Sequence, residues 1–175
     1  GWLDVITRPE RHNAVKVVLF LDVGGSMDMH VRVVEQLFAA ARAEFKHLEH
    51  YYFHNCLYEG VWRNNRRRWD EQTSTVDLLH TYGPDWRAIF VGDAAMSPYE
   101  ITHAGGANEH WNPDPGAVWL GRARETWPAS IWINPTPEPA WRYTQSTALI
   151  AEIFAGRMFP LTLAGLEAGI RTLAR

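Results

Sequence analysis

The sequence has very little cysteine: Cys56 is the single one among 175 residues. One thiol cannot close a disulfide within the chain or build a cysteine-based zinc site, so disulfide-stapled secreted folds and zinc modules of that kind are excluded. Low cysteine content of this kind is typical of reducing compartments. We therefore expect a cytoplasmic protein.

Long apolar runs and an excess of one charge are also missing. The clean apolar run near the start, residues 17–21, is far shorter than the ~20 residues that a membrane span requires, and we find no signal-peptide pattern. The chain carries 17 basic and 20 acidic side chains, for a formal net charge of −3. Mixed charge of this kind gives no general attraction to nucleic acid or to anionic membranes, and we expect neither as a partner.

The apolar content is sufficient for one sizeable core, with 46% hydrophobic and 13% aromatic residues. Residues 14–21 are β-branched and almost wholly apolar, which is typical of a strand buried on both faces of a parallel sheet. A glycine turn follows, and then apolar residues at helical spacing from Val34 to Phe45. Further strands are predicted at residues 51–53, 57–62, 87–91, 130–133 and 158–161.

Strands that alternate with helices predict the fold class. We expect an α/β fold with a doubly wound, Rossmann-like, mostly parallel sheet flanked by helices, and with one antiparallel edge strand. The domain is expected to span residues 14–175, with residues 1–13 as an N-terminal extension or edge segment.

Open α/β sheets bind ligands at the carboxyl ends of their strands, so polar residues at those ends are the candidates for function. The candidates here are Asp22, Gly24, Ser26, Thr73, Thr75 and Asp93. Every side-chain ligand in this set is an oxygen, which favours Mg²⁺, Mn²⁺ or Ca²⁺ over zinc. Two carboxylates close together also repel each other unless a cation neutralises them. The sequence therefore predicts a divalent-cation site.

This arrangement resembles the metal-ion-dependent adhesion site (MIDAS) of the von Willebrand factor A (VWA) domain family. The family pattern is Asp-x-Ser-x-Ser after the first strand, a threonine in a second loop and an aspartate after a later strand. Asp22-Val23-Gly24-Gly25-Ser26 matches with one departure, because Gly24 stands where the first serine is expected. The stretches 20–27 and 91–97 are similar to a bacterial, CoxE-like branch of the family.

The resemblance implies roles for individual residues. Asp22 and Asp93 would lie near the ion, bound directly or through water, while Ser26 and either Thr73 or Thr75 would supply hydroxyl groups. We prefer Thr75 because an apolar helical pattern begins there. Since Mg²⁺ commonly keeps several waters, a water could fill the position that Gly24 leaves open.

The same resemblance implies a function. Incomplete coordination by the protein leaves room for an acidic side chain of a partner, so the chain would be a divalent-cation-dependent protein-interaction module. The implied partners are a MoxR-type AAA+ ATPase or a client protein undergoing maturation. We expect no catalytic apparatus. The competing explanation is that Asp22, Ser26 and Asp93 merely cap turns and helices, but three separate segments with one ligand chemistry favour a site.

A haloacid-dehalogenase-like, metal-dependent phosphatase is the main alternative. Asp22 and Gly92-Asp93 fit its outline, in which the first strand ends in Asp-x-Asp and a later strand ends in Gly-Asp. However, Gly24 replaces the second aspartate, residues 94–97 contain no acid, and no lysine lies in the expected region. Without these groups a phosphoaspartyl mechanism lacks its proton donor and its charge clamp.

Two other patterns have simpler explanations. Three histidines, His47, His50 and His54, share no regular face, so we interpret them as structural or surface residues. The basic run at residues 66–68 beside Trp69 could contact phosphates while the indole stacks on a base, but a solvated hairpin loop explains it equally well.

The long polar stretch at residues 102–116 is predicted to be an ordered surface loop. Trp111 lies in it, and an exposed aromatic side chain in a loop can anchor a protein partner. If the loop folds over the strand ends, Glu109 or His110 would border the ion site. We therefore include Trp111, Glu109 and His110 as candidate partner-binding residues.

Overall fold

The computed structural model describes residues 13–175, with the side chain of Asn13 excepted. The predicted N-terminal extension therefore lies outside the described residues, apart from the backbone of Asn13. Seven strands form one sheet in the order β4-β3-β2-β1-β5-β6-β7. The strands are β1 (Asn13–Asp22), β2 (Phe45–Phe53), β3 (Gly60–Trp62), β4 (Gln72–Ser74), β5 (Arg87–Val91), β6 (Ser130–Asn134) and β7 (Met158–Pro160).

The sheet is mostly parallel. β1 pairs in parallel with β2 and with β5, and the parallel order continues through β6 to β7. Only β3 runs against its neighbours β2 and β4. The doubly wound, Rossmann-like α/β fold with an antiparallel edge is thus confirmed. One detail differs from the prediction: the antiparallel strand is second from the edge, because β4 pairs on its outer side.

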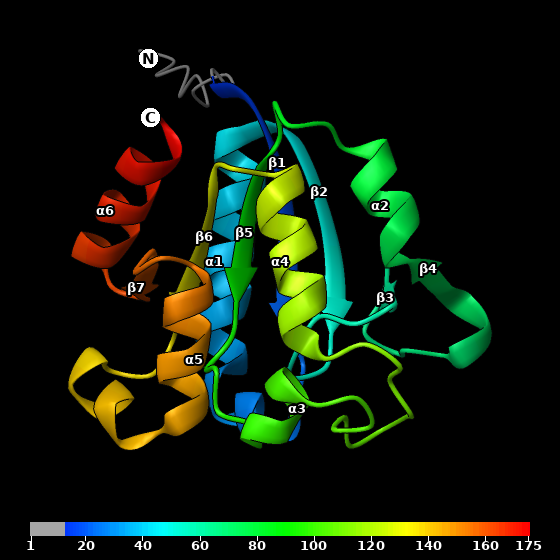
Figure 1. Ribbon diagram of the computed structural model, residues 1–175. Coiled ribbons are helices and arrows are strands. Elements are labelled where there is room, and N and C mark those ends of the chain that lie inside the picture. The colour runs from blue at the N-terminus through cyan, green and yellow to red at the C-terminus, as the bar shows by residue number, and fades with distance from the viewer. Residues whose placement is uncertain (1–12) are drawn as a thin grey trace, which may run out of the picture.

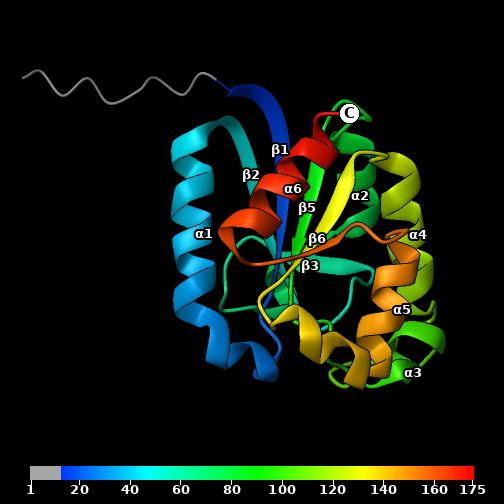
Figure 2. The same cartoon turned by 90° about the vertical axis from the view of Figure 1, so that its left-hand side faces the viewer.

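Helices cover both faces of the sheet (Figures 1 and 2). α1 (Val31–Glu44) and α6 (Leu163–Leu173) lie on one face, and α2 (Thr75–Thr81), α3 (Pro98–Thr102), α4 (Gly116–Thr126) and α5 (Gln145–Ile153) lie on the other. Three short 3₁₀ segments are also present, η1 (Gly25–His30), η2 (Trp69–Glu71) and η3 (Glu138–Tyr143). Among the described residues, no helix is long and apolar enough to cross a membrane.

The larger core lies on the α4 face and is built largely from aromatic rings. Phe20, Phe90 and Trp132 form a stack across adjacent strands β1, β5 and β6, with centroids 4.7 and 5.9 Å apart. The ring of Trp127 also packs against Phe20, with the two ring centroids 5.6 Å apart. Such pairs contribute about 0.5–1.5 kcal/mol each beyond the area that they bury. The stack holds the central strands, and hence their carboxyl ends, in fixed register.

The opposite face is covered less tightly. α1 has no fully buried residue, and its apolar residues Val34, Leu37 and Phe38 are only partly buried against β1 and β2. Phe45, which the helical spacing placed in this helix, is instead the first residue of β2. β2 is longer than predicted because pairing with β1 extends the strand through a polar stretch, Lys46 to His50, that lacks a strand pattern.

Candidate functional site

Asp22 is the last residue of the central strand β1 and is almost completely buried, with 3% of its surface exposed. Its Oδ1 accepts hydrogen bonds from the backbone N–H groups of Gly24 (2.8 Å) and Asn55 (2.9 Å). Its Oδ2 is buried and has no hydrogen-bond partner. A buried carboxylate oxygen without a donor is costly, so this atom marks a position where a cation or a proton is needed.

The surroundings of Asp22 raise the pKa of its carboxyl group strongly. Burial raises the pKa of the carboxyl to about 7, with smaller increases from the negative charges of Asp93 and Glu100. The hydrogen bonds from Gly24 and Asn55 oppose this rise. The carboxyl therefore changes charge near neutral pH, and a bound cation would favour its ionised form.

Asn55 comes from the end of the neighbouring strand β2 and lies against Gly24. Its side-chain Nδ2 donates to Glu100 Oε1 at 3.1 Å, and its Oδ1 lies only 1.9 Å from the position that a Cβ on Gly24 would take. The carboxamide oxygen of Asn55 thus fills the space in which a serine side chain at residue 24 would begin.

Glu100 is the third carboxylate near Asp22, after Asp93, and is 1% exposed. It completes a capping box at the start of α3, where Glu100 Oε2 accepts from the backbone N–H of Ser97 (3.2 Å). The backbone carbonyl of Glu100 accepts from the Tyr58 hydroxyl (2.9 Å). Neither Glu100 nor Asn55 was among the site residues predicted from the sequence. Two sequence signals could have identified them. Ser97-x-x-Glu100 is the pattern of a helix capping box, and Asn55 is a polar residue shortly after a predicted strand.

The other predicted site residues take different positions. Asp93 is buried after β5, and its Oδ1 accepts from the backbone N–H of Ala95 (3.1 Å). Thr75 is buried at the start of α2, and its hydroxyl donates a hydrogen bond to the backbone carbonyl of Tyr58. Thr73 lies in β4, paired with Val61. Ser26 is exposed in η1. Asp22 and Gly24 therefore form a buried polar cluster with Asn55, Asp93 and Glu100, while Thr73 belongs to the edge strand.

The oxygen atoms near Asp22 are of the type that binds a hard cation, but they are few. Within residues 13–175, no three His, Cys, Asp or Glu side chains come together as metal ligands. Mg²⁺ is usually held by one or two carboxylates with several waters. The unpartnered Oδ2 of Asp22, the carboxylate of Asp93 and the neutral oxygen of Asn55 match that chemistry. In ligand type, though not in number, the residues present are those that a divalent ion of this kind takes.

The loop at residues 103–115 is held by ion pairs to the segments that precede and follow β3. Glu109 accepts from Arg67 at 2.7 Å and pairs with His54 at 3.3 Å, and His110 pairs with Glu59 at 2.6 Å. Glu109 and His110 thus hold the loop in place. Trp111 is different, because it is 73% exposed and its ring lies over Gly105, whose φ is +69°.

The two lysines lie far from Asp22 along the strands. Lys16 is in the first half of β1 and pairs with Asp85 at 3.1 Å, in the loop that precedes β5. Lys46 is the second residue of β2. Both are therefore at the amino ends of the strands, at the opposite edge of the sheet from Asp22. A phosphatase of the haloacid-dehalogenase kind would need a lysine beside that carboxylate.

Comparison with known proteins found no match for this chain: no family model fits the sequence, and no curated protein and no solved structure is similar to it.

Proposed function

We propose that this chain is a divalent-cation-dependent protein-interaction module of the VWA and MIDAS kind, with its ion at the carboxyl end of β1. The observation that supports the proposal most directly is the Oδ2 atom of Asp22, which is buried and lacks a donor. A divalent ion there would compensate the charge of Asp22 and its repulsion by Asp93 and Glu100.

Three side chains are the candidates to hold the ion through their oxygens. They are Asp22 Oδ2, the carboxylate of Asp93 and, in place of the missing serine, Asn55 Oδ1. The Thr75 hydroxyl donates a hydrogen bond to the Tyr58 carbonyl, so its oxygen lone pairs remain available to an ion or to a water. Mg²⁺ is the proposed ion, with Mn²⁺ or Ca²⁺ as substitutes of the same ligand preference.

The proposed ligands leave coordination positions for water and for one more oxygen. An acidic side chain of a partner protein would complete the shell, which makes binding metal-dependent. The partner implied by the VWA resemblance is a MoxR-type AAA+ ATPase or a client under maturation, in the cytoplasm. The exposed ring of Trp111 gives the loop at residues 103–115 an apolar contact point for the same partner.

Calorimetric titration of chelator-treated protein with Mn²⁺ tests the proposal. The wild type should bind one ion saturably, and Asp22→Asn should weaken binding at least about tenfold, a loss of ~1.4 kcal/mol or more. Asp70→Asn, a matched charge loss at an exposed site in η2, should bind like the wild type. The absence of saturable binding, or equal binding by a folded Asp22→Asn variant, would overturn the proposal.

A further inference from the structure

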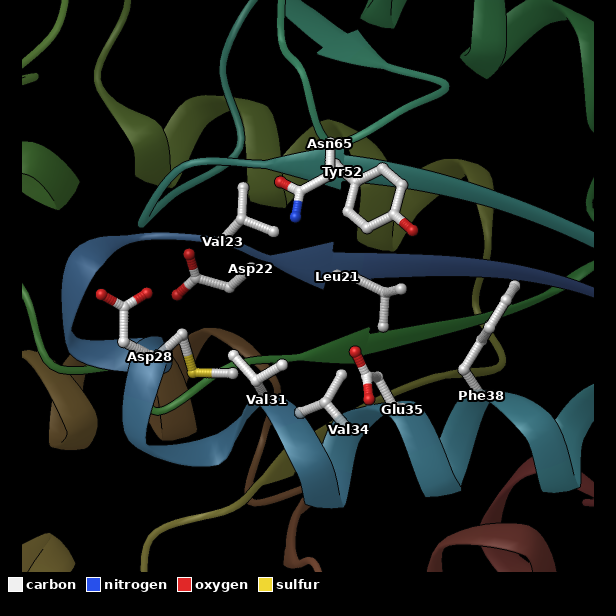
Figure 3. Close-up of a pocket in the computed structure, with 11 residues that line it drawn as sticks. Leu21, Asp22, Val23, Asp28, Val31, Val34, Glu35, Phe38, Tyr52 and Asn65 are labelled. Atoms are coloured by element: carbon white, nitrogen blue, oxygen red, sulfur yellow. The ribbon is translucent and has the colours of Figure 1, made fainter.

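A groove of about 250 Å³ opens between β1, Tyr52 of β2 and the segment η1–α1 (Figure 3). Its walls are mostly apolar, with Leu21, Met27, Val34 and Phe38 among the lining residues. It exists because α1 buries none of its residues completely against the sheet. The groove is below the ~300–1,000 Å³ of sites for drug-sized ligands, so it suits a single side chain.

Three carboxylates line the groove, Asp22, Asp28 and Glu35, and no Lys or Arg side chain does. In the close-up, the carboxylates of Asp22 and Asp28 point toward each other at one end, and Glu35 projects from α1 toward β1 (Figure 3). Among the described residues, neither Asp28 nor Glu35 forms an ion pair or a side-chain hydrogen bond.

Asp22 provides an independent indication of a ligand. It is 97% buried, since only 3% of its surface is exposed, and its Oδ2 has no donor within the described part of the chain. The groove therefore joins an unsatisfied acceptor and two unpaired acids to an apolar wall. Uncompensated carboxylates at such a surface attract a cation that also has an apolar stem.

We infer that this groove receives an arginine side chain of a partner protein. The guanidinium would bind between the carboxylates, which it can pair with in a bidentate manner, and the aliphatic stem would lie along the apolar wall. Arginine also fits the aromatic lining, because guanidinium groups stack on such rings. The guanidinium of Arg42 already lies over the Phe38 ring, 5.6 Å from its centroid.

The inference goes beyond the proposed ion and does not rest on it, although both sites use Asp22. It is therefore tested in EDTA, where a divalent ion is absent, and with variants that leave Asp22 intact. The probe is N-acetyl-arginine methylamide, added to ¹⁵N-labelled protein and followed by the backbone amide shifts. N-acetyl-citrulline methylamide has the same shape without the charge and serves as the control ligand.

The arginine probe should cause saturable shifts confined to the groove-lining residues, with a dissociation constant on the order of 1 mM. Citrulline should bind at least about tenfold more weakly. Glu35→Gln combined with Asp28→Asn should weaken arginine binding by a similar factor, whereas Glu44→Gln, a charge loss at the end of the same helix, should not.

Three results would each overturn the inference. They are the absence of saturable shifts, equal binding of arginine and citrulline, and unchanged binding by the double variant. The exchanged side chains are exposed, so the variants should fold, and the dispersion of their amide spectra verifies this. Loss of Mn²⁺ binding by Asp22→Asn would leave these results unaffected, so the two proposals fail separately.

Discussion

The side chain of Asn55 occupies the space beside Gly24 in which any larger residue would place its Cβ. The Asn55 Oδ1 atom is 1.9 Å from that position, and the backbone N–H groups of both residues donate to the same Asp22 oxygen. Gly24 and Asn55 therefore depend on each other, although they follow two different strands, β1 and β2. This contact explains why residue 24 is a glycine, because a serine there would collide with Asn55.

Gly24→Ser should destabilise the protein by about 1–3 kcal/mol, because the new Cβ collides with Asn55. Combining it with Asn55→Gly should recover part of this loss, since glycine removes the collision and tolerates the φ of +61° at residue 55. Urea unfolding of the wild type, both single variants and the double variant gives the coupling between the two sites. Additive effects would show that the two side chains do not compete for one space.

Asp22 should make the stability depend on pH between about 4 and 7. In this window the unfolded carboxyl, with a pKa of 3.8, is ionised, while the folded one, with a pKa of about 7, holds its proton. The folded state binds more protons, so the free energy of unfolding falls as pH rises and levels off above pH 7. The full effect is at most about 4 kcal/mol.

Asp22→Asn removes this titration. Its stability relative to the wild type should therefore increase as pH rises from 4 to 7, when both are measured by urea unfolding in chelator. Asp70→Asn, at an exposed site, should follow the wild-type curve. A constant difference between Asp22→Asn and the wild type over this range would contradict the raised pKa.

Trp132→Phe should cost about 2–4 kcal/mol of stability. The Trp132 indole is fully buried, stacks on Phe90 at an interplanar angle of 4°, and donates from Nε1 to the carbonyl of Gly92 at 2.8 Å. Phenylalanine leaves a cavity and an unsatisfied buried carbonyl. Thermal unfolding measures the loss. Trp69→Phe, at a largely exposed indole, is the control and should change stability by less than about 1 kcal/mol.

Glu109→Gln should loosen the loop at residues 103–115 without unfolding the domain. The Glu109 carboxylate bridges Arg67 and His54, but it is partly exposed, so the effect on global stability should stay below about 1 kcal/mol. Local opening should increase, which limited proteolysis detects as faster cleavage within the loop. Glu125→Gln, in α4, is the matched control. Equal cleavage rates for both variants would show that these ion pairs do not hold the loop.

Much of the fold follows from local patterns. The apolar run at residues 14–21 predicted β1, and helical spacing predicted α1, because burial on one face or on both imposes a period that neighbouring residues reveal. β2 was predicted too short, since its polar middle stretch is strand only through pairing with β1. α3 was missed because five residues are too few for a period.

The sequence by itself determined most of the elements and two of the polar residues at strand ends, Asp22 and Asp93, because these depend on local periodicity and on polar residues that follow apolar runs. Only the tertiary structure decided which side chains meet. Asn55 is 33 residues from Asp22 and 45 from Glu100, and no local pattern joins them. Their contact arises because the parallel pairing of β1 with β2 brings the two strand ends together, and burial then requires each polar group to find a partner.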